Sequence, residues 1–194
     1  MSARRQHGFA VLEQLLGVAL IASITTACIH FFSHYTRIQF QQIQHAQALT
    51  ELNQISTIIT NTLSGAHGYK KPIAVDSSTA YLAVGQYKNE ATASCVVFAF
   101  DRNRDGHISR LSPVEHYGFR LNKKAIEYRL DAKTCDQGHW QDLTHTGTLL
   151  VDKLEFHVSL DASVIDVNIQ AHTKTTTPIF VTLSRKMILR NSLQ

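Results

Sequence analysis

The chain opens with an apolar segment that is long enough to cross a membrane. Residues 9–32 read FAVLEQLLGVALIASITTACIHFF and contain no lysine, arginine or proline. A helix needs about 20 mostly apolar residues to span a bilayer. Arg4 and Arg5 precede the segment, and the positive-inside rule keeps such residues in the cytoplasm. The pattern therefore predicts one membrane-spanning helix at 9–32, with everything after Phe32 exported.

The apolar positions become periodic after this segment. They recur mostly every three or four residues, at Ile38, Ile43, Ala46, Leu49, Leu52, Ile55, Ile59 and Leu63. This spacing is typical of an amphipathic helix. No proline or glycine interrupts residues 18–64, and Gly65 and Gly68 are plausible terminators. We expect one helix of about 55 residues, about 80 Å long at about 1.5 Å per residue. Its continuation at 33–65 should pack its apolar face on a globular domain.

The remainder of the chain, 66–194, has the short segments of a β-rich domain. Candidate strands lie at 80–86, 95–100, 115–121, 124–130, 149–158, 163–171 and 179–190. A hairpin turn is expected at residues 122–124, and the short connections favour an antiparallel sheet. The predicted fold class is α+β, with a long N-terminal helix packed on a C-terminal antiparallel sheet domain.

Composition and charge narrow the function only slightly. The 194 residues are 44% hydrophobic, and the formal net charge is +4. This excess is too small to indicate nucleic acid by itself. Basic residues near the end of the chain could touch DNA, but a solvated strand face explains them better; these are Lys174, Arg185, Lys186 and Arg190. No phosphate loop, G-x-S-x-G or H-E-x-x-H motif is present, so no enzymatic site is predicted.

Glu13 does not fit a plain membrane segment. A carboxylate inside a bilayer costs several kcal/mol unless it lies near the interface or is paired. An ordinary secretory signal would also end in an A-x-A-like cleavage site, and none closes this segment convincingly. Something outside the segment should therefore compensate Glu13.

The sequence Gly8-Phe9-Ala10-Val11-Leu12-Glu13 resembles the processing site of type IV prepilins and pseudopilins. The resemblance implies that a prepilin peptidase removes the leader 1–8 by cutting after Gly8. Phe9 would become the first residue, methylated on its amine, and Glu13 the fifth. In that family the glutamate is thought to pair with the N-terminal amine of a neighbouring subunit, which would neutralise the charge and fix the register of the fibre. The competing interpretation is a signal anchor with a chance Gly-Phe.

Looser similarities in the second half point to one type of minor pilin. The segments are Cys95–Asp101 with Asn103, Asp105 and Gly106, then Tyr117–Leu121, then Cys135 with Trp140 and Leu143, and the ending 181–191. They resemble the PilW and PpdB (prepilin peptidase-dependent protein B) type. The absence of the proline that many major pilins carry in the apolar helix also leans towards a minor component. The resemblance implies a role in starting or capping the pilus, with the major pilin, other minor pilins and the prepilin peptidase as partners. It places the protein in the inner membrane with a periplasmic domain, and later in the pilus.

The three cysteines separate into two groups. Cys28 lies in the apolar segment, whereas Cys95 and Cys135 lie in the polar remainder. The sequence contains no C-x-x-C pair, so neither a zinc site nor a redox motif is indicated. If the domain is exported, Cys95 and Cys135 are free to form a disulfide; the alternative is two unpaired buried thiols.

Residues 101–108, DRNRDGHI, have the opening of a calcium loop. Asp101, Asn103 and Asp105 offer oxygen ligands at positions one, three and five, and glycine follows at six. Ser112 replaces the usual glutamate at position twelve, and Glu115 could serve instead. An Asx-rich turn, whose aspartates bond backbone amides, explains the same residues without a metal. Calcium is therefore a possible cofactor and the turn the leading interpretation.

Four further hypotheses stay open. His30 and His34 are spaced i, i+4 on the helix and could bind a metal, but no third ligand is apparent, so a helix–helix or membrane-interface role is favoured. The protein could be a minor pseudopilin of a type II secretion system, which shares the leader and the fold. It could also be a membrane-anchored calcium-binding or adhesive module, or an enzyme on a signal anchor for which no site is visible.

Overall fold

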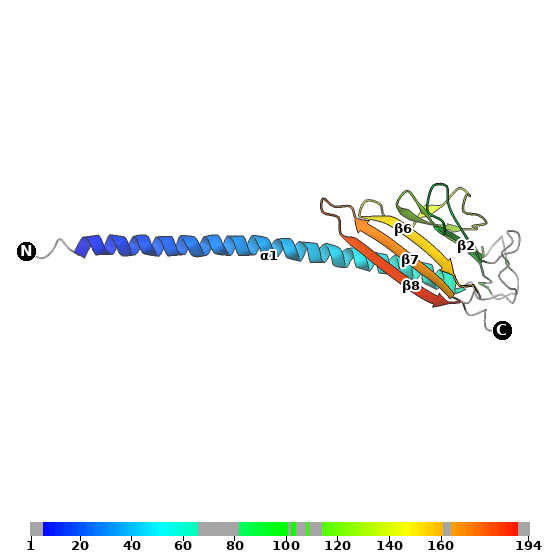
Figure 1. Ribbon diagram of the computed structural model, residues 1–194, viewed down its shortest axis with the longest axis horizontal. Coiled ribbons are helices and arrows are strands. Elements are labelled where there is room, and N and C mark those ends of the chain that lie inside the picture. Colours follow the sequence, from blue (N-terminus) through cyan, green and yellow to red (C-terminus); the bar gives the residue numbers. More distant parts are fainter. Residues whose placement is uncertain are drawn as a thin grey trace, which may run out of the picture. The chain divides into compact units, whose positions relative to one another are not determined.

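The computed structural model describes residues 6–65, 82–100, 102–103, 108, 114–160 and 164–189. A helix followed by strands forms the regular structure of this part of the chain (Figure 1). Their bounds are α1 (Gln6–Ser64), β1 (Leu82–Gly85), β2 (Cys95–Ala99), β3 (His116–Asn122), β4 (Ala125–Leu130), β5 (Gln141–Asp142), β6 (Leu149–Val158), β7 (Val164–Thr173) and β8 (Phe180–Ile188). The chain divides into two compact units, Met1–Gln44 and His45–Gln194.

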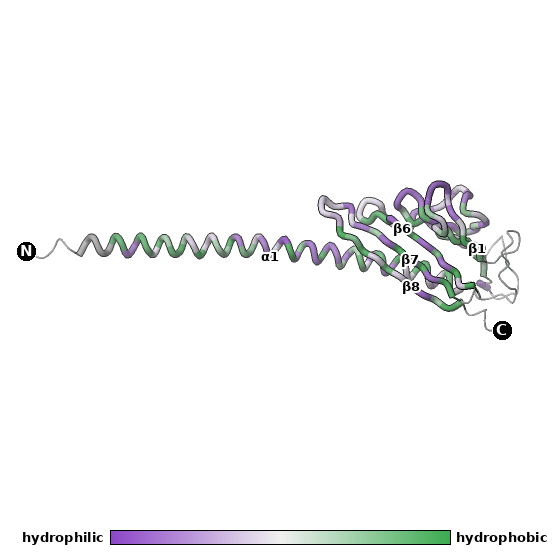
Figure 2. Tube along the Cα trace, in the orientation of Figure 1, coloured by the Kyte–Doolittle hydropathy of each residue, from purple (hydrophilic) through white to green (hydrophobic). Residues whose placement is uncertain are grey.

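The first unit exposes its apolar side chains. The large aliphatic and aromatic residues from Val11 to Phe32 are each more than half exposed, and the tube coloured by hydropathy shows how densely they follow one another (Figure 2). The hydroxyls in this segment are satisfied within the helix: Ser23 donates to the carbonyl of Leu20 at 2.8 Å, and Thr26 to that of Ala22 at 2.7 Å. Such bonds let polar side chains lie in an apolar solvent, because no donor is left without an acceptor.

The second unit contains two antiparallel sheets. One has five strands in the order β1-β2-β3-β4-β5, and the other has three in the order β6-β7-β8. Every neighbouring pair is antiparallel. Within this unit the end of α1 shares a core with both sheets. The expected α+β, pilin-like fold class is therefore confirmed.

The buried face of α1 begins later than the sequence predicted. Its core residues are spaced by four, three, four and four positions, at Ala48, Leu52, Ile55, Ile59 and Leu63. The expected positions at Ile38, Ile43 and Ala46 are exposed instead. The prediction for these three was wrong because apolar periodicity shows which face a helix can bury, but not how many of its turns meet a partner in the same chain.

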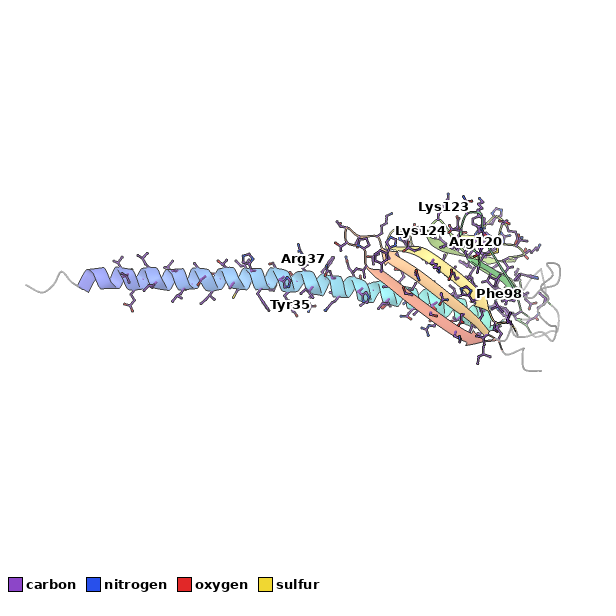
Figure 3. The ribbon with its side chains drawn as sticks, viewed as in Figure 1. Tyr35, Arg37, Phe98, Arg120, Lys123 and Lys124 are labelled. Carbon is purple, nitrogen blue, oxygen red and sulfur yellow. A yellow bond between two sulfur atoms is a disulfide. The ribbon has the colours of Figure 1, made fainter. Side chains whose placement is uncertain are left out.

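Alternate residues of the strands complete this core. Phe98 on β2 stacks with Tyr117 and Phe119 on β3, at centroid separations of 5.8 and 6.1 Å (Figure 3 labels Phe98). Opposite them, Leu154 and Phe156 of β6 are essentially without solvent exposure. Aromatic pairs of this kind add about 0.5–1.5 kcal/mol each beyond the area they bury.

Backbone hydrogen bonds join the two sheets at the free edge of β6. The amide of Val151 donates to the carbonyl of Lys124 at 2.9 Å, and the amide of Phe156 donates to the carbonyl of Ala93 at 2.9 Å. A β-bulge lies between Val151 and Lys153, where the register with β7 shifts by one residue. The sheets are thus connected through main-chain atoms as well as through the core.

The β3–β4 hairpin is tighter than predicted. Asn122 pairs with Ala125, so the turn consists of Lys123 and Lys124 alone. Both have positive φ, 47° and 70°, as a two-residue type I′ turn requires. The sequence indicated a three-residue turn because Lys-Lys lacks the Asn-Gly signature of this turn type.

Candidate functional sites

The N-terminal processing residues lie at the beginning of α1. The helix starts at Gln6, so the Gly8–Phe9 bond falls in its first turn. The side chains of 6–10 lie outside the described residues. Glu13 follows about one turn later and is exposed, and it makes no ion pair or side-chain hydrogen bond with another described residue. Nothing in the described part of its own chain compensates this carboxylate.

Among the described residues, α1 contains a stretch, Val11–Ser64, that is long and apolar enough to cross a membrane. Length and composition alone are a weak criterion, because a signal sequence or a buried core helix can also satisfy it. The core-helix explanation does not apply here, since the most apolar window of this stretch is not buried by the rest of the chain.

A disulfide joins Cys95 to Cys135, with 6.1 Å between their Cα atoms. Cys95 is the first residue of β2, and Cys135 lies in the connection between β4 and β5. The expected pairing is confirmed. Cys28, in α1, is a free and exposed thiol.

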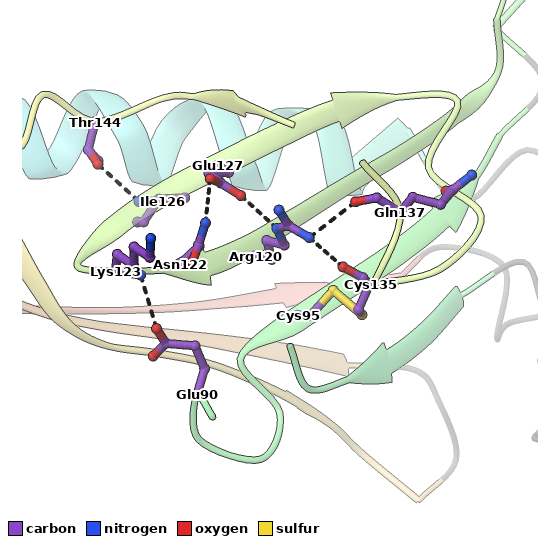
Figure 4. A network of polar contacts seen from close by, with 10 residues as sticks. All are labelled: Glu90, Cys95, Arg120, Asn122, Lys123, Ile126, Glu127, Cys135, Gln137 and Thr144. Carbon is purple, nitrogen blue, oxygen red and sulfur yellow. Dashed lines mark hydrogen bonds and ion pairs between the residues drawn. A yellow bond between two sulfur atoms is a disulfide. The ribbon is translucent and has the colours of Figure 1, made fainter. Parts of the chain in front are cut away.

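A buried arginine ties this connection to the five-stranded sheet (Figure 4). Arg120 on β3 forms an ion pair with Glu127 on β4 at 2.6 Å, and their side chains are 6% and 10% exposed. Arg120 Nη1 also donates to the carbonyl of Cys135 at 2.6 Å and to that of Gln137 at 3.4 Å. Asn122 donates to the second oxygen of Glu127 at 2.8 Å. Every charged group of the cluster therefore has a polar partner, as burial demands.

Aromatic rings enclose the same arginine. The guanidinium carbon lies 3.6 Å from the centre of the Tyr87 ring and 4.5 Å from that of Trp140. Gly118 makes room for the indole, because a Cβ there would lie 2.7 Å from Trp140 Cη2 and 2.7 Å from Ala132 Cβ. Both charged groups of the cluster are buried and engaged in these contacts, and we interpret it as structural.

The sequence did not predict this arginine cluster. The available signal was weak: Arg120 and Glu127 become neighbours only if residues 122–125 form a tight turn. The contribution of Tyr87 could not be foreseen, because Tyr87 lies 33 residues earlier in a loop.

The calcium prediction remains untested. Asp101 and Asp105 lie outside the described residues, and Asn103 is exposed. Glu115 is fully buried, and its Oε1 accepts hydrogen bonds from the amides of Arg102 at 2.8 Å and Asn103 at 3.3 Å. This carboxylate thus accepts hydrogen bonds from two successive main-chain amides. The described residues contain no group of three or more His, Cys, Asp or Glu placed to hold a metal.

A second polar cluster lies at the β6 bulge. Asp152 accepts a hydrogen bond from Lys124 Nζ at 2.6 Å, and its other oxygen lies 2.6 Å from His172 Nδ1. The Phe180 ring lies beside His172, with 5.4 Å between centroids. Partial burial of Asp152 raises the pKa of its carboxyl, but the bonds and charges of Lys124 and His172 together outweigh this and leave the pKa lowered. The cluster links the β3–β4 turn to the three-stranded sheet.

These features define a class of protein before any comparison is made. A long helix that is apolar and uncovered in its first part, joined to disulfide-bonded antiparallel sheets, is the architecture of a pilin-like protein. The family model for prepilin peptidase-dependent protein B (PpdB) matches residues 41–189, about three quarters of the chain, and the chain belongs to that family. No curated protein and no solved structure matches it.

Family membership carries several consequences. The protein is a prepilin-like minor pilin of a structural family, and the family's name implies processing by prepilin peptidase. The apolar helix is consistent with a membrane-anchored prepilin. The matched residues contain the disulfide and the arginine cluster, whereas the Gly8–Glu13 motif precedes them. The family match and the processing motif are therefore independent of each other, because the match covers residues 41–189 and the motif lies in the first turns of α1.

Proposed function

We propose that this protein is a minor pilin that helps to initiate or cap a type IV pilus. The observation that carries the proposal is the exposed apolar part of α1, in which Glu13 is the only acidic residue before Glu51. Such a surface needs lipid before assembly and other helices after it. A structural protein of this family has no need of a catalytic site.

Processing would occur between Gly8 and Phe9 and would create the group that Glu13 needs. Cleavage leaves an α-amine on Phe9, four residues before Glu13. In an assembled tip, the amine of one subunit would pair with Glu13 of its neighbour. Pairing removes most of the cost of two isolated charges in an apolar setting, and it fixes one register because only one alignment satisfies both.

The processing step is tested by mass spectrometry of the N-terminal peptide from membrane and sheared-fibre fractions. A methylated Phe9 at the N-terminus is expected. Gly8→Ala should leave the longer chain in the membrane. A chain that still begins at Met1 in cells with active prepilin peptidase would refute the assigned site.

The assembly step is tested with the two acidic residues of α1. Glu13→Ala should permit cleavage but strongly reduce co-purification with the other minor pilins. Glu51→Ala is the matched control, since its carboxylate only makes a long 3.5 Å contact with Thr148; it should co-purify normally. Equal recovery of both variants would rule out the pairing role.

Type II secretion is the alternative within the same class. A minor pseudopilin would share the leader, Glu13 and the fold, so the two proposals differ only in their assembly partners. Deleting the gene and measuring surface pili and protein secretion separately would distinguish them. A membrane-anchored calcium-binding or adhesive module, by contrast, predicts an uncleaved leader and no effect of Glu13→Ala.

A further inference from the structure

A group of basic and aromatic side chains lies on one side of α1 directly after its most apolar part. We call it the collar and define it as His30, Phe31, His34, Tyr35 and Arg37. Arg37 is the only lysine, arginine, aspartate or glutamate between Glu13 and Glu51. It makes no ion pair with another described residue. A single permanent positive charge thus lies on 37 consecutive residues that are otherwise uncharged or histidine.

The helical spacing arranges the collar in two stripes. His30, His34 and Arg37 follow one another at i, i+4 and i+7, which places them on one face. Phe31 and Tyr35 form the neighbouring stripe, with stacked rings 6.3 Å apart, and Gln39 donates to the Tyr35 hydroxyl at 2.7 Å. Phe31 is 73% exposed and Tyr35 50% exposed. Figure 3 labels Tyr35 and Arg37 on this part of α1.

The distance along the helix places the collar at a membrane surface. Arg37 lies 24 residues after Glu13, which corresponds to about 36 Å at about 1.5 Å per residue. The hydrocarbon core of a bilayer is about 30 Å thick. With the N-terminus at the cytoplasmic surface, the apolar segment fills the core, and the collar emerges among the headgroups of the opposite leaflet.

We propose that the collar is a phospholipid-headgroup site that sets the depth of α1 in the periplasmic leaflet of the membrane. This inference rests on the membrane anchorage contained in the proposed function. The guanidinium of Arg37 would bind lipid phosphate in a bidentate manner. The ring N–H groups of the two histidines offer further donors. Phe31 and Tyr35 would lie at the boundary between acyl chains and headgroups, where aromatic side chains are enriched.

The chemistry favours lipid over a protein strand or a nucleic acid. The collar offers one permanent cation, ring N–H donors and aromatic rings but no acidic group, which complements a layer of phosphates above hydrocarbon. The apolar residues directly before it need that hydrocarbon in any case. One permanent charge is too little for a nucleic-acid backbone, where affinity comes from many phosphate contacts.

The chain carries its own depth probe. Cys28 is a free, exposed thiol nine residues before Arg37, about 13 Å deeper along the helix. The full-length protein, with its disulfide intact, would be labelled at Cys28 with a fluorophore and reconstituted into phosphatidylcholine–phosphatidylglycerol vesicles. Nitroxide lipids with the quencher near the headgroup or deep in the acyl chain then report the position of the label.

The wild-type label should be quenched mainly by the deep nitroxide. Arg37→Glu should move the label towards the surface and raise the ratio of shallow to deep quenching at least about fivefold, because losing one cation near an anionic surface corresponds to about fivefold and the new carboxylate adds repulsion. Arg37→Lys keeps the charge but loses the bidentate geometry, so its ratio should lie between those of the wild type and Arg37→Glu. Lys174→Glu, the same change in charge as Arg37→Glu but at an exposed position in the β7–β8 connection, should keep the wild-type ratio.

The outcomes separate the collar from the proposed function. An Arg37→Glu ratio equal to that of the wild type would overturn the collar and leave the membrane anchor intact. A wild-type label quenched by neither lipid would overturn the anchor as well. The pilus assembly role is not measured in vesicles, so neither result depends on it.

Discussion

Replacing Arg120 by methionine should destabilise the domain strongly although it removes no part of the hydrophobic core. Methionine keeps much of the side-chain volume but none of the charge. Glu127 would stay buried with Asn122 as its remaining side-chain partner, and the carbonyls of Cys135 and Gln137 would lose their donor. Removing one member of a buried ion pair typically costs about 3–5 kcal/mol. A domain of this size has a total stability of about 5–15 kcal/mol, so the loss is a large fraction of it.

The experiment can use an intrinsic probe. Trp140 is the only tryptophan and lies against Arg120, so its fluorescence reports the cluster directly. Urea unfolding in detergent, followed by fluorescence and by circular dichroism, gives the free energy of unfolding. Arg185→Met is the matched control: Arg185 is exposed and makes one hydrogen bond, to Asn53 at 3.1 Å. We expect a loss of about 1 kcal/mol or less for this variant.

The double variant Arg120→Met/Glu127→Leu tests the reasoning itself. The loss of stability in Arg120→Met is expected to arise from the Glu127 carboxylate, which stays buried without its cationic partner. Removing both charges should then recover part of this stability, since well-packed apolar replacements of buried pairs are often nearly neutral. A loss below about 1 kcal/mol in the single variant would refute the argument. So would a double variant that is less stable than the single one.

Three further changes test other parts of the domain. Replacing Cys95 and Cys135 by serine opens a loop closed across 40 residues and should cost about 4 kcal/mol in the same urea assay. Gly118→Ala should cost about 1–3 kcal/mol and alter Trp140 fluorescence in the native state, because the new methyl would meet the indole. The lowered pKa of Asp152 gives stability that is complete above its ordinary pKa of 3.8 and is lost as the pH falls through the folded value; Asp152→Asn should therefore reduce stability at neutral pH by about 1 kcal/mol or less and have no such effect once the wild-type carboxyl is protonated.

The sequence predicted most elements of the fold because their signals are local. The helix end near Gly65 and seven of the eight strands follow from periodicity and turn residues. The β5 strand, Gln141–Asp142, was missed because two polar residues carry no pattern. It pairs with β4 at Glu127 and Tyr128, and the Tyr128 hydroxyl donates to Gln141 Oε1 at 2.6 Å. The polar clusters were missed for the same reason: they join residues that only the folded sheets bring together.

The two polar clusters and the disulfide have a common consequence for the domain. Each fastens a connection or turn to a sheet: the disulfide and Arg120 hold the β4–β5 connection, and Asp152 holds the β3–β4 turn. Loops are normally the least stable parts of a fold. Here the β3–β4 turn and the β4–β5 connection are fixed by charge-assisted bonds, as a subunit of the proposed fibre would need in order to present one surface to its neighbours.

The first unit, Met1–Gln44, differs from the second in the source of its stability. The large apolar side chains from Val11 to Ile43 are exposed, and helical propensity alone contributes little in water. In the proposed pilin role, the stability of this part of the helix would come first from lipid and then from other subunits. The domain folds on its own contacts, whereas the helix is ordered by what surrounds it. In that role the subunit would leave the membrane only as neighbouring helices replaced the lipid, which would couple extraction to assembly.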